Sequence, residues 1–261
     1  GSEMCIRDSL SVRLSDRHFG IGGDGIILVC PSKVADAKMK MYNLDGSEGK
    51  MCGNGIRCVG KFLYDHGMVD YKEKDEITIE TLSGIKSLKA YTTNGEVTSL
   101  RVDMGKAILD PKEIPVAMNK DKIVNEPVTI GDKEYNITCV SMGNPHCVVF
   151  MDDIDNLDIE KIGPMFENDK LFPERVNTEF VTVLDDHTIK MRVWERGSGE
   201  TWACGTGACA VAVAACENGF CKKGDDIKIK LKGGDLVINY TDETVYMTGN
   251  AEKVFEGEIE V

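Results

Sequence analysis

Short segments in which apolar and polar residues alternate dominate this chain, and period-two patterns of this kind predict β-strands. They run over residues 26–29, 38–42, 76–81, 85–91, 99–104, 136–140, 147–151, 179–183, 188–193, 227–231, 236–240 and 245–248. Helical character is confined to three segments. Gly53–His66 is amphipathic, Ala208–Cys216 is apolar on every side, as in a helix buried all round, and Asp158–Asn168 contains Pro164, which bends or interrupts a helix. Many strands and few helices predict an α+β fold.

Two short motifs repeat along the chain, M-C-G-N-G-I-R-C at residues 51–58 and A-C-G-T-G-A-C-A at residues 203–210. Their first cysteines, Cys52 and Cys204, lie 152 positions apart (204 − 52 = 152). Each motif follows a strand-like segment and opens a predicted helix that ends near Gly67 or Gly219. An internal repeat of about 150 residues predicts two similar domains with one site between them.

The predicted domains cover residues 1–111 and 112–252, with a junction near Pro111 and with residues 253–261 returning to the first domain as a strand. Residues 1–9 show no periodicity and have no counterpart in the second half, so we expect a tag remnant or truncation scar without a role in the fold. The glycines of Phe19–Val29 lead into a strand, whereas a dinucleotide-binding loop opens a helix, so this segment is predicted to be a turn.

Charge and composition exclude several classes of protein. The chain carries 31 Lys and Arg against 44 Asp and Glu, a formal net charge of −13, without a basic run that would bind nucleic acid. No apolar stretch approaches the roughly 20 residues of a membrane span, and no signal segment opens the chain, so a cytoplasmic protein is predicted. The ten cysteines lack C-x-x-C spacing and accompany 42% hydrophobic residues, which favours reduced thiols over a disulfide framework or a metal site.

The two motif cysteines suit acid-base chemistry. A cysteine directly before a helix meets free backbone N–H groups and the positive end of the helix dipole, which predicts a thiol pKa below the ordinary value of about 8.5. The motif glycines let a substrate approach the backbone, so that the N–H groups of Asn54 and Thr206 can bind a carboxylate. Each motif alone is typical of a tight turn with a buried cysteine. Their repetition in register favours two thiols on opposite faces of one carbon.

Three other residues are candidates for the site. His146, in the polar turn M-G-N-P-H, is placed to relay a proton to a thiol, or else is a hydrogen-bonded structural histidine. Glu195 and Arg196 align with Asn43 and Leu44 in the repeat. Arginine suits bidentate capture of a carboxylate, although a solvated surface pair is the alternative.

With C-G-N-G-I-R-C, M-G-N-P-H, E-R-G-S-G-E-T and A-C-G-T-G-A-C-A in this order, the chain resembles the diaminopimelate epimerases over about residues 14–261. The resemblance implies two pseudo-symmetric halves, each a curved and mostly antiparallel sheet around a central helix, with the active site in the cleft between them. It also implies an isomerase that interconverts L,L- and meso-diaminopimelate for lysine and peptidoglycan precursors. No cofactor or metal takes part, and a homodimer is implied.

The resemblance also implies roles for individual residues. Cys52 and Cys204 become the two acid-base residues, which swap roles with the direction of the reaction. The residues implied in substrate binding are Asn43, Gly53, Asn54, Asn144, Asn177, Glu195, Arg196, Gly205 and Thr206. His146 and Glu195 are implied to modulate the two thiols as second-layer residues. The family's opening strand and its Asn-Asp pair have no match in residues 1–9, so impaired activity is expected of this chain.

Two other functions fit the same residues. One is a two-cysteine racemase that acts on proline or hydroxyproline, although Arg196 and the amides favour a substrate with a second charged end. The other is a non-catalytic thiol redox or amino-acid-binding protein, since facing cysteines can form a disulfide.

Overall fold

The computed structural model describes residues 3–69, 74 and 76–260. The chain divides into two compact units, of which unit 1 contains Gly1–Val102 and Gly249–Val261 and unit 2 contains Asp103–Thr248. Unit 1 is therefore assembled from both ends of the chain. The division after Val102 comes earlier than the predicted junction near Pro111. None of the helices in the described part of the chain is both long and apolar enough to cross a membrane.

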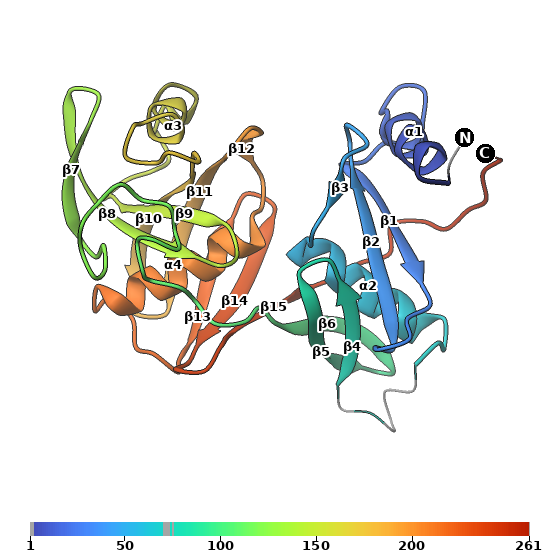
Figure 1. The fold of residues 1–261 in the computed structure, drawn as a ribbon. Coiled ribbons are helices and arrows are strands. Elements are labelled where there is room, and N and C mark those ends of the chain that lie inside the picture. Colours follow the sequence, from blue (N-terminus) through green and yellow to red (C-terminus); the bar gives the residue numbers. More distant parts are fainter. Residues whose placement is uncertain (1–2, 70–73, 75, 261) are drawn as a thin grey trace. The chain divides into compact units, whose positions relative to one another are not determined.

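Unit 1 is a sheet with one central helix (Figure 1). Its elements are α1 Glu3–Ser15, β1 Gly25–Cys30, β2 Ala37–Asn43, β3 Glu48–Gly49, α2 Gly53–Asp65, β4 Ile77–Thr81, β5 Gly84–Thr93 and β6 Glu96–Asp103. The strand order is β1-β2-β4-β5-β6, with β3 paired to β2. Strands β2 and β4 are parallel and the other pairs are antiparallel. Helix α2 connects the parallel pair and buries Ile56, Val59 and Leu63, because a parallel pair needs a crossover connection.

Unit 2 repeats this arrangement with more strands. Its elements are β7 Glu126–Ile130, β8 Lys133–Ser141, β9 Pro145–Phe150, α3 Ile159–Glu167, β10 Asn177–Asp185, β11 Thr188–Glu195, β12 Gly199–Thr201, α4 Gly205–Glu217, β13 Asp226–Leu231, β14 Gly234–Tyr240 and β15 Val245–Asn250. The strand order is β15-β14-β13-β11-β10-β9-β8-β7, with β12 paired to β11. Strands β9 and β10 are parallel, as are β11 and β13. Helix α4 connects β11 to β13 as α2 connects β2 to β4, so the repeat is structural.

Helix α4 fulfils the prediction of burial on every side. Ten of its residues are buried, and it contacts β8, β9, β10, β13 and β14, against which Figure 1 shows it lying. Its run of alanine and valine leaves little side-chain volume, so the strands approach the helix closely. The predicted α+β fold, with few helices and many strands, is confirmed.

The two ends of the chain differ from the predictions. Glu3–Ser15 forms helix α1, which contacts β1 and β2, and the Ser11 hydroxyl donates to the carbonyls of Tyr42 and Asn43 at 3.1 and 2.8 Å. Residues 3–9, which show no periodicity in the sequence, form the first part of this helix. The returning segment 251–260 clusters with unit 1 and forms no strand. Its contacts include a hydrogen bond from Arg13 to the carbonyl of Glu260.

Candidate functional site

The two motif cysteines occupy the same local geometry in their separate units. Cys52 is the N-cap of α2 with φ −130° and ψ 122°, and Cys204 is the N-cap of α4 with φ −129° and ψ 108°. Each helix contains 13 residues and is followed by a glycine with positive φ, 64° at Gly67 and 78° at Gly219. The sequence repeat thus specifies both the start and the end of each helix.

The glycines that follow the cysteines are needed for close packing. A Cβ on Gly55 would lie 2.5 Å from the Cδ1 of Ile27, and a Cβ on Gly207 would lie 2.7 Å from Oε1 of Glu179. Ile27 and Glu179 are themselves separated by the repeat spacing (179 − 27 = 152). The same position therefore carries an apolar side chain in unit 1 and a carboxylate in unit 2.

In unit 1 the first turn of α2 is held by hydrogen bonds around Cys52. The N–H of Gly55 donates to the Cys52 sulfur at 3.4 Å. Arg57 is buried and donates to the carbonyl of Gly53 at 3.0 Å and to Oδ1 of Asn54 at 3.1 Å. Arg57 thus fixes two predicted substrate-binding residues. Its place inside the motif C-G-N-G-I-R-C was the only signal in the sequence for this role.

Asn43 lies at the end of β2, in the turn that leads back to β3. Its Nδ2 donates to the Ser47 hydroxyl at 3.0 Å, and its backbone N–H donates to the Ser47 carbonyl at 2.8 Å. These two hydrogen bonds fix the side chain, and the Asn43 Oδ1 takes part in neither of them. A free amide oxygen is suited to accept a hydrogen bond from an ammonium group.

In unit 2 the environment of Cys204 differs from the predicted one. Burial raises the pKa of the Cys204 thiol well above its ordinary value, and Glu195 and Glu179 add to this rise. The expectation of a lowered pKa is therefore wrong for Cys204, because desolvation and two nearby carboxylates outweigh the helix N-terminus. A hydrogen bond with Thr206 opposes the rise. Cys204 is accordingly a thiol at neutral pH.

A series of side-chain hydrogen bonds, here called the polar chain, leads from Glu179 on β10 to Cys204. Glu179 Oε1 lies 2.7 Å from Nδ1 of His146, and His146 Nε2 lies 3.1 Å from Oδ1 of Asn144. Asn144 Nδ2 donates to Oγ1 of Thr206 at 3.3 Å, and Thr206 Oγ1 lies 3.6 Å from the Cys204 sulfur. His146 therefore reaches the thiol only through two intermediates. The sequence did not identify Glu179 as a site residue, because the strand pattern does not show that its carboxylate is buried.

The other predicted residues of unit 2 surround the end of β11. Asn177 donates to the carbonyl of Pro145 at 3.2 Å, and its Oδ1 accepts from the N–H of Arg196 at 2.8 Å, so this amide holds the backbone of the turn. Arg196 donates to the carbonyl of Glu174 at 2.8 Å. Glu195 accepts from the hydroxyl of Thr201. The structure thus gives Asn177 a structural task beside any contact with substrate.

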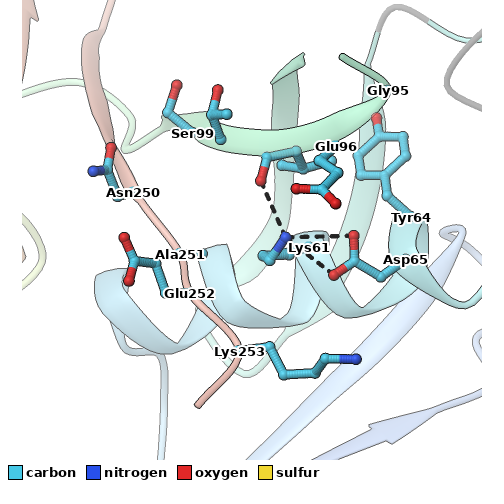
Figure 2. Close-up of a pocket in the computed structure, with 12 residues that line it drawn as sticks. Lys61, Tyr64, Asp65, Gly95, Glu96, Ser99, Asn250, Ala251, Glu252 and Lys253 are labelled. Carbon is cyan, nitrogen blue, oxygen red and sulfur yellow. Dashed lines mark hydrogen bonds and ion pairs between the residues drawn. The ribbon is translucent and has the colours of Figure 1, made fainter. Parts of the chain in front are cut away.

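A polar pocket of about 860 Å³ lies in unit 1 and contains none of the predicted site residues (Figure 2). Lys61 is its central cation, and it donates to the carbonyl of Val97 at 3.1 Å and pairs with Asp65 at 3.1 Å. Glu252 and Lys253 of the returning segment form the opposite wall in Figure 2. Lys61 is therefore already paired within the pocket and is not a free cation for a ligand.

Comparison with known sequences gives one consistent family. A family model described as diaminopimelate epimerase matches residues 3–109 and 138–254. A diaminopimelate epimerase from Agathobacter rectalis is 53% identical over 262 residues, which cover 97% of this chain and 90% of that protein. One from Methanococcus maripaludis is 54% identical over 256 residues, which cover 97% and 91%.

Solved structures share the fold at low sequence identity. A probable proline racemase from Agrobacterium radiobacter superposes with a TM-score of 0.67 at 18% identity, covering 96% of this chain and 79% of its own. A hydroxyproline epimerase from Agrobacterium vitis superposes with a TM-score of 0.68 at 16% identity, covering 96% and 78%. These likenesses extend over nearly the whole chain and concern the architecture alone.

Proposed function

Because this chain belongs to the diaminopimelate epimerase family, we propose that it interconverts L,L- and meso-diaminopimelate with two cysteines and without a cofactor. The observation that carries the proposal is the repeated N-cap geometry of Cys52 and Cys204, one at the start of the central helix of each unit. Two thiols in the same backbone position match a reaction that removes a proton from one face of a carbon and returns one to the other face.

The proton balance assigns a task to each sulfur. One thiolate takes the α-hydrogen as a proton, and the electron pair of the broken C–H bond moves toward the substrate carboxylate. The other thiol then gives its proton to the opposite face of the carbon, and it remains as a thiolate. Burial favours the thiol form of Cys204, and the two cysteines exchange the roles of acid and base when the reaction runs in the opposite direction.

The remaining residues bind the substrate in this proposal. First-turn N–H groups at Gly53, Asn54, Gly205 and Thr206 have no intrahelical acceptor and are suited to the carboxylate at the reacting centre. Asn43, Asn144, Asn177, Glu195 and Arg196 bind chiefly the distal amino-acid end. Glu195 also faces Cys204, where its charge favours the thiol.

In this proposal the protein works as a homodimer in the cytoplasm. Analytical sedimentation tests the homodimer, which should have twice the mass of one chain.

Proton exchange at Cα in deuterated water tests the proposal. The wild-type chain should incorporate deuterium into L,L-diaminopimelate, and Cys52→Ala and Cys204→Ala should each lower the rate by about 100-fold or more, as expected for loss of an acid or base. Cys58→Ala is the matched control, because Cys58 is an exposed thiol of the same motif. Full activity of either alanine variant would contradict the mechanism. Exchange with proline or hydroxyproline instead would assign a different substrate, and binding without exchange would indicate a non-catalytic protein.

A further inference from the structure

Glu179 is a buried carboxylate that the fold does not require. Its side chain is fully buried on β10, and its Oε2 has no hydrogen-bond partner among the described residues. At the equivalent position of unit 1 the repeat places Ile27, which packs against the first turn of α2 as Glu179 packs against that of α4. An apolar side chain therefore satisfies this packing. Since burial of a carboxylate is unfavourable, its presence in unit 2 calls for a functional reason.

The polar chain has a direction, set by the amide in its middle. Asn144 accepts at Oδ1 from His146 and donates from Nδ2 to Thr206. Thr206 Oγ1 therefore receives a hydrogen bond from Asn144, and its own hydroxyl hydrogen is left for the Cys204 sulfur. An amide gives up no proton at neutral pH, so the chain transmits the orientation of hydrogen bonds and does not conduct protons.

This direction requires a proton on Nε2 of His146. Glu179 Oε1 faces the other ring nitrogen at 2.7 Å, so one further proton lies between the carboxyl and Nδ1. Whichever of the two atoms holds it, the pair carries no net charge, the state favoured when both side chains are buried. Burial also raises the pKa of the Glu179 carboxyl, and His146 opposes this rise. In both arrangements Nε2 keeps its proton and donates to Asn144.

Building on the proposed epimerase function, we propose that Glu179 is a positioning residue that sets the direction of the polar chain. By holding His146 with a proton on Nε2, it turns the Asn144 amide and aims the Thr206 hydroxyl at the Cys204 sulfur. When Cys204 has given its proton to the substrate, the sulfur left behind is a thiolate in a buried place beside Glu195. The hydroxyl then donates to this thiolate and lowers its free energy. Cys52, in unit 1, has a backbone N–H as donor instead.

Replacement of Glu179 by glutamine tests this assignment. Without the carboxylate, His146 loses the anion that balances a second ring proton, and its single proton can move to Nδ1, where the amide oxygen of the glutamine accepts it. Nε2 then accepts, the Asn144 amide turns over, and the Thr206 hydroxyl donates to Asn144 and no longer to the sulfur. We expect Glu179→Gln to lower kcat about tenfold with KM little changed, as for loss of a hydrogen bond to a charged group.

The decisive measurement is the ¹⁵N spectrum of the His146 ring, assigned by the loss of its signals in His146→Gln. The wild-type ring should be protonated on Nε2, and Glu179→Gln should show the Nδ1-protonated form. Thr178→Val is the matched control, because the Thr178 hydroxyl lies on the same strand, is buried, and has no hydrogen-bond partner in the described part of the chain. It should leave the ring spectrum and kcat unchanged. A ring that stays Nε2-protonated in Glu179→Gln would overturn the proposal.

The far end of the polar chain gives an independent check. Thr206→Val removes the hydroxyl and should lower kcat, whereas Thr206→Ser keeps it and should lose less. The double variant Glu179→Gln/Thr206→Val should be no slower than the slower single variant, because both changes interrupt the same polar chain. The proposal would be contradicted if the loss of kcat in the double variant equalled the product of the two single losses. Equal kcat values for Thr206→Val and Thr206→Ser would also contradict it. The ring spectrum needs no turnover, so failure of the wild type to exchange the α-hydrogen would remove the proposed function without deciding the role of Glu179.

Discussion

At the scale of single residues, the closeness of two glycines to neighbouring side chains shapes both helix starts. The Cβ that alanine would add at Gly207 lies 2.7 Å from Glu179 Oε1, 3.1 Å from Cε of Met191 and 3.2 Å from Cβ of Cys204. These neighbours belong to buried residues that have little room to move. Gly207 therefore serves the packing around the thiol as well as access for a substrate.

Gly207→Ala should destabilise the protein. Overpacking costs about 1–3 kcal/mol, and the higher helix propensity of alanine returns only about 1 kcal/mol. Chemical denaturation measures the difference in the free energy of unfolding. Gly257→Ala is the control, since its added Cβ would meet no heavy atom within 4 Å. Equal stability of Gly207→Ala and the wild type would show that the neighbours yield without cost.

At the scale of elements, the two central helices meet their sheets in different ways. Helix α4 buries alanine and valine on all sides, whereas α2 is amphipathic, with Ile56 fully buried and Phe62 38% exposed. Helix α2 is therefore anchored through one face. The position of Cys52 at its N-terminus depends on that face staying packed.

Ile56→Ala should lower the free energy of unfolding by about 2–5 kcal/mol, because the cavity left by a buried isoleucine is only partly refilled. Phe62→Ala on the same helix should cost distinctly less, since its ring is partly exposed. Thermal unfolding followed by circular dichroism compares the two variants. A larger loss for Phe62→Ala would mean that the exposed side of α2 is covered in the working protein.

At the scale of the whole molecule, the two units have different chain topologies. Unit 2 is one continuous segment, Asp103–Thr248, while unit 1 needs both ends of the chain. Unit 2 also has its own core around Phe166, Phe180 and Ile137. A continuous segment with a buried core of its own has what a domain needs to fold alone.

Residues 103–248, expressed alone, should therefore fold with a single cooperative transition. The isolated unit should lack epimerase activity, because Cys52 is absent, while the ring of His146 should still be protonated on Nε2. Circular dichroism and the ¹⁵N spectrum measure these properties. A polypeptide without a cooperative transition would show that unit 2 depends on unit 1 for its stability.

The sequence by itself determined the α+β fold, the three main helices and the in-register repeat, because periodicity and capping are local properties. It missed β7, whose Pro127 weakens the strand pattern and whose pairing with β8 comes from the tertiary structure. It also missed helix α1, in which the Ser11 hydroxyl donates to the carbonyls of Tyr42 and Asn43 at the end of β2.

Only the tertiary structure decided the environment of the candidate thiols. A raised pKa at Cys204 follows from burial and from carboxylates on other strands, none of which is adjacent to it in the sequence. The carboxylate of Glu179 acquires its place in the polar chain only because β9, β10 and the start of α4 converge. Hydrophobic pattern specifies which segments become strands, but desolvation and long-range hydrogen bonds depend on which side chains the folded strands bring together.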